Sequence, residues 1–156
     1  MMNQGVRAAV IAVQADTILL VRHVHPQSGE EWWCPPGGAL EGTDASVQDC
    51  ASREAIEETG LQAEIGRLVY IREFREADRN TRWVELYFLA ESLRGSIKGE
   101  HRTGMRKAEK YIREAKWIEK EQLPSLPVFP EILKDHFWAD YPNGFRQVRH
   151  LGISSG

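Results

Sequence analysis

Hydrophobic positions along the chain fall into short runs separated by polar turns, a pattern typical of a mixed α and β domain. The run from residue 6 to residue 13 is almost continuously apolar, which predicts a buried strand. Ala15 and Asp16 form a turn before the next apolar run, so the two runs predict a hairpin. The predicted strands cover residues 6–13, 17–22, 63–74, 83–90 and 115–118.

Helical signals occur in two other places. Ser46 is a candidate N-cap, with Asp49 three residues later in a capping-box position, and Gly60 is positioned to end this helix. Residues 130–138 predict a second helix. Strands alternating with two helices predict an α/β or α+β fold, in which helices flank a mixed sheet. The remaining segments predict polar or charged loops over residues 23–31, 75–82 and 96–110.

Composition narrows the class of protein. A chain of 156 residues with 42% hydrophobic residues suits one domain, residues 1–156, with a loose tail at 154–156. A net charge of −3 gives no general attraction to nucleic acid or anionic membranes. The chain contains neither a long apolar run nor a signal-like N-terminus, and its two cysteines form no disulfide framework or zinc cluster. These features predict a cytoplasmic protein without membrane contact.

Three carboxylates on one face of the first helix are the main chemical signal. Glu54, Glu57 and Glu58 are three or four residues apart or adjacent, so they repel one another unless a cation lies between them. Hard divalent cations prefer such oxygen ligands. A glycine turn, residues 35–40, precedes the helix and can lie against that face. The alternative is a solvated Glu-rich helix with a glycine cap, and the added turn and Arg53 favour the metal interpretation.

The segment from Arg53 to Leu61 resembles the second half of the Nudix hydrolase signature, Gly-x5-Glu-x7-Arg-Glu-U-x-Glu-Glu-x-Gly-U, in which U is bulky and apolar. The approach Trp33-x-x-Pro-Gly-Gly38 is also similar to this family. The first half departs from the signature: five residues after Gly38 stands Asp44 instead of Glu, and eight residues, not seven, separate it from Arg53. One extra residue in this turn explains the spacing, with Asp44 in the supporting role of the family's first glutamate.

The resemblance implies a Nudix-type α/β/α sandwich and a hydrolase that cleaves the diphosphate linkage of a nucleoside diphosphate derivative. Nucleotide sugars, ADP-ribose and oxidised nucleoside triphosphates are substrates of this kind. Mg²⁺ or Mn²⁺ is the implied cofactor, because a divalent cation neutralises a diphosphate and lowers the pKa of a bound water. The implied metal ligands are the Gly37 carbonyl, Glu54, Glu57 and Glu58. Arg53 is implied to orient a glutamate, and its alternative role is a surface pair with Glu57.

The general base and the phosphate contacts have several candidates. Glu54 is one possible base, and the resemblance suggests a loop glutamate as another, with Glu109 preferred to Glu114 and to Glu100. Arg22, Arg102 and Arg106 are candidate phosphate ligands. The predicted catalytic residues are therefore Glu54, Glu109 and Arg53. We interpret His23 and His25 as surface-loop residues and Trp33 as an anchor of the glycine turn.

A second functional hypothesis is a non-hydrolytic, Nudix-like module that binds a nucleotide and regulates another process. The complete Arg-Glu-x-x-Glu-Glu segment favours the enzyme, since a binding module needs no full metal face. The pattern does not select a substrate. The negative net charge makes a small nucleotide a better partner than RNA, and the resemblance suggests a homodimer.

Overall fold

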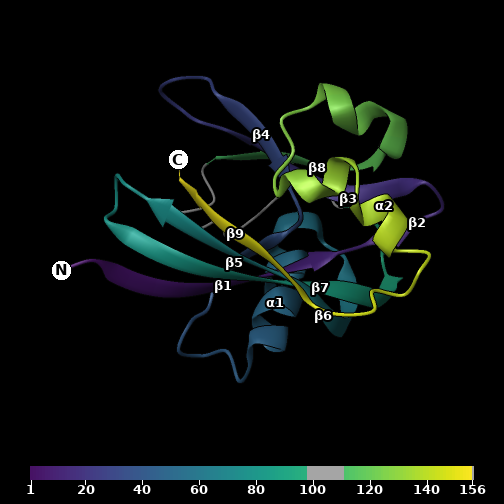
Figure 1. Ribbon diagram of the computed structural model, residues 1–156, viewed down its shortest axis with the longest axis horizontal. Coiled ribbons are helices and arrows are strands. Elements are labelled where there is room, and N and C mark those ends of the chain that lie inside the picture. Colours follow the sequence, from purple (N-terminus) through teal and green to yellow (C-terminus); the bar gives the residue numbers. More distant parts are fainter. Residues whose placement is uncertain (98–110, 156) are drawn as a thin grey trace.

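The computed structural model describes residues 1–97 and 111–155, and its centre is a curved five-stranded sheet (Figure 1). The strands of this sheet are, in spatial order, β5 (Gly37–Ala39), β1 (Asn3–Ile11), β7 (Thr81–Arg94), β6 (Gln62–Glu76) and β9 (Arg149–Ser155). One helix, α1 (Val47–Thr59), packs on one face of the sheet. The sheet is mixed, because β1 pairs parallel with β7 and antiparallel with β5, which confirms the predicted fold class.

A second sheet and three short helices cover the other face. The second sheet contains β2 (Val13–Gln14), β3 (Thr17–Val24), β4 (Glu31–Cys34) and β8 (Ile112–Glu119). The short helices are η2 (Lys120–Ser125), η3 (Glu131–Lys134) and α2 (Phe137–Asp140). None of the helices in residues 1–97 and 111–155 is long and apolar enough to span a membrane.

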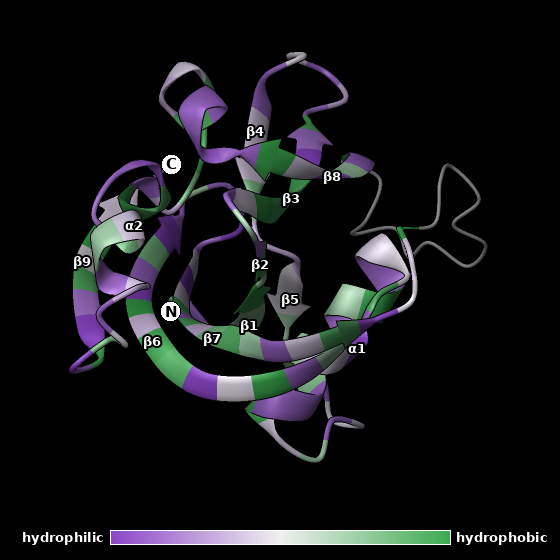
Figure 2. Cartoon of the chain, turned by 90° about the vertical axis from the view of Figure 1, so that its right-hand side faces the viewer, coloured by the Kyte–Doolittle hydropathy of each residue, from purple (hydrophilic) through white to green (hydrophobic). Residues whose placement is uncertain are grey.

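Alternation along β1 divides the core into two layers, because successive side chains of a strand point to opposite faces. Ala8 and Val10 are buried against α1, whereas Ile11 packs with Tyr70 and Tyr87 in the core between the two sheets. The strongly curved ribbons of β6 and β7 carry both hydrophobic and hydrophilic bands along their length (Figure 2). The sheet therefore has one face for the helix and one for the second sheet.

The ends of α1 follow the sequence signals. The Ser46 side chain accepts a hydrogen bond from the Asp49 N–H at 3.1 Å. Gly60 ends the helix with φ 82°, a left-handed conformation that glycine adopts without steric cost, and its N–H donates to the Ile56 carbonyl at 2.9 Å. Both predicted caps are confirmed.

Other predicted boundaries are wrong. The single helix predicted over 130–138 is two short pieces, and the Asp135 side chain accepts from the His136 N–H, a local bond that competes with the helix. The charged turn predicted over 75–82 is shorter, because β6 runs to Glu76 and β7 begins at Thr81. The predicted tail is largely strand, since Ser154 and Ser155 pair with β6.

Candidate active site

The buried carboxylates of α1 face the short strand β5. Glu54 is 7% exposed and Glu58 is 4% exposed, values that are unusual for charged residues. Gly38 makes room for one of them, because a Cβ at this position would clash with the Glu54 carboxylate. The glycine turn and the helix thus fit together as the sequence predicts.

Arg53 connects the carboxylates of the site. Its Nε and Nη2 donate to the two oxygens of Asp44 at 2.8 and 2.9 Å, a bidentate pair. Its Nη1 lies 3.0 Å from Glu54 Oε1 and 3.3 Å from both Glu57 oxygens. The hydrogen bond from Arg53 lowers the pKa of Asp44, which also accepts from the Glu41 N–H at 2.9 Å. Asp44 is thus joined to the site through Arg53.

Glu58 sits in a different environment. Its Oε1 accepts a hydrogen bond from the Gly37 N–H at 2.7 Å. Burial raises the pKa of Glu58 well above the usual value; the nearby His23 acts in the opposite direction and Glu54 raises the pKa further. The sequence predicts the Gly37 carbonyl as a metal ligand, and this stays a prediction. The structure shows instead that the Gly37 N–H donates to Glu58. Glu58 is therefore a carboxylate that gains from a nearby cation.

The acidic residues suit a divalent metal chemically, although they do not enclose one as they stand. Among the residues that the structure describes, no three His, Cys, Asp or Glu groups converge well enough to hold a metal. Glu54 and Glu57 turn toward Arg53, and Glu58 turns toward Gly37. Because hard cations prefer carboxylate oxygens, the donor set fits Mg²⁺ or Mn²⁺ once Glu54 and Glu57 rotate away from Arg53.

His23 is a member of the site that sequence reasoning placed in a surface loop. It lies in β3 opposite Trp32 of β4, and the two rings stack with centroids 5.2 Å apart. Its Nδ1 is 3.2 Å from the Val21 carbonyl and 3.7 Å from Cys34 Sγ. The loop interpretation of His23 is wrong, and extending the predicted strand by two residues would have placed it on the same face as Val21.

The structure does not bring Arg22 to the carboxylates. Arg22 pairs in register with Trp33 and not with Trp32, so it points to the opposite face of the sheet from its neighbour His23. Its guanidinium lies 3.1 Å from Glu31 and 3.7 Å from Glu114. The other predicted residues of this group lie outside the described residues, namely Glu100, Arg102, Arg106 and Glu109.

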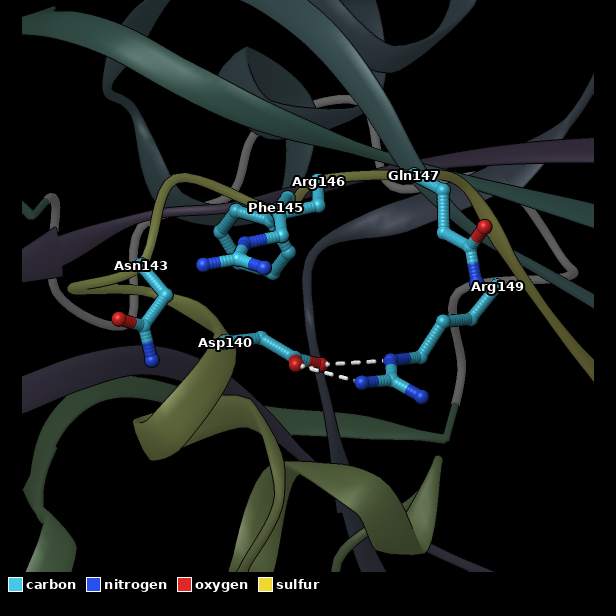
Figure 3. A pocket seen from close by; sticks show the side chains of 6 residues that line it. All are labelled: Asp140, Asn143, Phe145, Arg146, Gln147 and Arg149. Atoms are coloured by element: carbon cyan, nitrogen blue, oxygen red, sulfur yellow. Dashed lines mark hydrogen bonds and ion pairs between the residues drawn. The ribbon is translucent and has the colours of Figure 1, made fainter.

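A separate hollow of about 450 Å³ lies between α2 and β9 (Figure 3). Its carboxylate, Asp140, accepts from Arg149 Nη2 at 2.9 Å and from the Tyr70 hydroxyl at 2.8 Å. Figure 3 shows Asp140 and Arg149 reaching toward each other across this hollow. Since these groups satisfy one another, they tie α2, β6 and β9 together, and the α1 carboxylates remain the better candidate site.

Comparison with known proteins adds a family. The model of the NUDIX domain matches residues 3–137. A search among curated proteins finds no match.

Solved structures share the fold. A NUDIX hydrolase from Nitrosomonas europaea is 22% identical, with a TM-score of 0.71 over 94% of this chain and 93% of that one. A UDP-X diphosphatase is 20% identical, with a TM-score of 0.67 over 99% of this chain and 68% of that one. An ADP-ribose pyrophosphatase from Streptococcus suis is 18% identical, with a TM-score of 0.58 over 96% and 98%. The last two names specify different substrates, so this similarity selects none for the present chain.

Proposed function

Because the chain belongs to the NUDIX domain family, we propose that it is a metal-dependent hydrolase of the diphosphate linkage in a nucleoside diphosphate derivative. Nucleotide sugars, ADP-ribose and nucleoside triphosphates are the substrate types that suit this reaction. One observation carries the proposal: Arg53 gathers Asp44, Glu54 and Glu57, while Glu58 is buried beside them against Gly37. A site that collects so many carboxylates around one guanidinium is suited to a divalent cation.

The side chains of the site have different proposed roles. Glu54, Glu57 and Glu58 would hold Mg²⁺ or Mn²⁺, which when bound neutralises the diphosphate and lowers the pKa of a water. Arg53 holds Glu54 and Glu57 in the metal-free site, and Asp44 in turn fixes Arg53. Glu54 is the candidate base within the described site, because Gly38 leaves its carboxylate room at the edge of β5. Glu109 remains the alternative base.

The cellular setting follows from weaker observations. We infer a small nucleotide as the partner, since the net charge of −3 does not favour long nucleic acid. Both cysteines, Cys34 and Cys50, are free thiols, which supports a reducing compartment such as the cytoplasm. A homodimer is the proposed assembly.

A nucleotide-binding module without hydrolysis is the second candidate. One observation favours it, namely that no metal-holding cluster is formed among residues 1–97 and 111–155. A module of this kind would bind nucleotides and release no phosphate or nucleoside monophosphate. The enzyme hypothesis requires instead that Glu54 and Glu57 leave Arg53 when the metal binds.

The deciding experiment measures product release from a panel of nucleotide sugars, ADP-ribose and nucleoside triphosphates, with Mg²⁺, Mn²⁺ or a chelator. We expect metal-dependent turnover that falls about 100-fold or more in Glu57→Gln, which corresponds to about 2.7 kcal/mol of barrier. The matched control is Glu64→Gln, an exposed glutamate on β6 that should leave the rate unchanged. Turnover that persists in the chelator would refute the metal role, and binding without turnover would favour the module.

A further inference from the structure

Three charged side chains form a row across neighbouring strands of the main sheet. Arg7 of β1 pairs in register with Glu85 of β7, which pairs in register with Arg72 of β6. Arg72 places Nε and Nη2 each 2.7 Å from Glu85 Oε1, while Arg7 Nε lies 3.6 Å from Oε2. We call these three residues the charged row. The Arg72 and Glu85 side chains are only 15% and 13% exposed, so the row lies largely within the folded protein.

The charged row lies beside the candidate active site. Arg7 is two residues before Ala9, and Ala9 pairs with Gly37, whose N–H binds Glu58. Two residues along a strand span roughly 7 Å, and they point to the same face. The row therefore lies two residues along β1 from the position that pairs with Gly37, the residue whose N–H binds Glu58.

The thiol of Cys34 is close to both the charged row and Glu58. Burial raises its pKa to about 12, and the charges of Arg7, Glu85 and Arg72 all act on it. The same thiol is among the groups that act on Glu58. Cys34 thus lies near both the carboxylates and the charged row.

The row retains, in a fixed order, hydrogen-bonding groups that its own ion pairs do not use. Glu85 Oε2 accepts no hydrogen bond within the described part of the chain, because its ion pair with Arg7 is longer than a hydrogen bond. A guanidinium has five N–H donors, and Arg72 directs only those of Nε and Nη2 at Glu85. Arg7 also retains donors.

Aromatic rings hold both guanidiniums in place. The guanidinium carbon of Arg7 lies 5.4 Å from the centre of the Trp83 ring, and that of Arg72 lies 5.6 Å from the centre of the Phe74 ring. The charged row therefore presents a preorganised sequence of donor, acceptor and donor.

We propose that the charged row selects a uracil-type base, so that the substrate is a uridine or thymidine diphosphate derivative. The proposal rests on the proposed function and names its substrate class. The edge of a pyrimidine-2,4-dione carries an N3–H between two carbonyl oxygens, which is acceptor, donor and acceptor. This order is the complement of the row, with N3–H donating to Glu85 Oε2 and the carbonyls accepting from Arg7 and Arg72.

The edges of the other nucleobases do not match the hydrogen-bonding groups of the row. Cytosine and adenine place an unprotonated ring nitrogen against the Glu85 carboxylate, and two acceptors repel each other. Guanine offers an N1–H but places its amino group against a guanidinium. A site that binds through buried polar groups rejects such mismatches because its own groups are left unpaired.

The first test compares the glucose diphosphates of uridine, thymidine, cytidine, adenosine and guanosine under one metal condition. We expect kcat/KM to favour uridine and thymidine by about 10- to 100-fold, the range that good base-edge contacts provide. Comparison with the 2′-deoxyuridine compound, which differs from the uridine compound only in the sugar, distinguishes a ribose from a deoxyribose substrate. Calorimetric binding of UDP and CDP without metal gives a readout independent of turnover.

The outcomes separate the two proposals. If no compound is hydrolysed, the proposed function fails, while tighter binding of UDP than CDP still supports the row. If all five are hydrolysed alike and UDP and CDP bind alike, the uracil proposal is overturned and the hydrolase stands. The 3-methyluridine analogue of UDP-glucose lacks the N3–H and so tests its hydrogen bond to Glu85 without altering the protein. Its kcat/KM should fall to the level of the cytidine compound.

Glu85→Gln is the matching protein variant. Because one oxygen must still accept from Arg72, the amide NH₂ takes the place of Oε2 and becomes a donor. We expect the uridine preference to fall by about 10-fold and the cytidine compound to improve, since its ring nitrogen now meets a donor. Glu73→Gln is the control, an ion-paired glutamate of β6 that contacts Arg82 and His150. An unchanged uridine preference in a folded Glu85→Gln variant overturns the proposal.

Discussion

Glu58→Gln tests whether the buried carboxylate of α1 exists for a metal or for the fold. The substitution removes one negative charge with little change in shape. It leaves a carbonyl oxygen that can still accept the hydrogen bond from the Gly37 N–H, now 2.7 Å from Glu58 Oε1. Fold and metal binding therefore respond to this change in different directions.

The expected stability of the metal-free variant follows from two opposing effects. A hydrogen bond to a charged group contributes about 1.5–3 kcal/mol and one to a neutral group about 0.5–1.5 kcal/mol, so about 1 kcal/mol is lost at Gly37. Burial of the charge near Glu54 is relieved in the variant, and burial is the main cause of the raised pKa of Glu58. We expect the metal-free variant to be as stable as the parent chain or more stable.

The pH dependence has a definite sign. A carboxyl whose folded pKa is raised contributes stability that is complete below its unfolded pKa of about 4.3. This contribution is lost as the pH rises through the raised folded value. The advantage of Glu58→Gln over the parent chain should therefore grow from pH 4 upward.

Thermal unfolding with and without Mg²⁺ or Mn²⁺ provides the measurement. Metal at 100 times its Kd should stabilise the parent chain by about 2.7 kcal/mol. For a domain of this size that corresponds to a rise in Tm of about 5–10 °C. Glu58→Gln should lose most of this rise and most of the turnover. A metal-free Tm that drops by more than about 4 °C, with an unchanged rate, would show that Glu58 is structural.

Three further variants test the supports of the site. Asp44→Ala should lower kcat about 10-fold, or about 1.4 kcal/mol, because Arg53 loses its bidentate partner, and steady-state kinetics checks this. Gly38→Ala should reduce activity more than Tm, because its methyl group displaces the Glu54 carboxylate; equal activity would show that this carboxylate is not needed where it lies. Asp140→Asn should make Tm less sensitive to acid below about pH 4, because the hydrogen bond from Arg149 lowers the pKa of Asp140 and that contribution is lost as the pH falls through the folded pKa.

Features set by local sequence were predictable. The N-cap at Ser46 and the left-handed Gly60 depend on residues within one turn of the helix, and both are found where the pattern puts them. The strands β1 and β7 also follow from their own apolar residues, although β7 extends beyond the predicted 83–90 at both ends. Arg53 and Asp44 are nine positions apart, so a motif of this length can predict that they pair.

Features set by pairing were not predictable. The strands β4 and β5 are short, β9 carries a weak pattern, and all three depend on a neighbouring strand for their hydrogen bonds. The same limit applies to Arg72 and Glu85. Irregularities in the pairing of β6 with β7 shift the register between Glu64 and Tyr70, so counting along β6 does not show which residue faces Glu85.

This difference in origin separates reaction from recognition. The carboxylates of α1 are set by one contiguous segment, so the proposed metal site depends on a helix and the adjoining glycine turn. The charged row instead draws Arg7, Arg72 and Glu85 from three strands whose pairing places them side by side. In the described residues the row makes no hydrogen bond or ion pair with α1. The preference for one nucleobase can therefore be changed by substitution in the strands without altering the residues proposed to hold the metal.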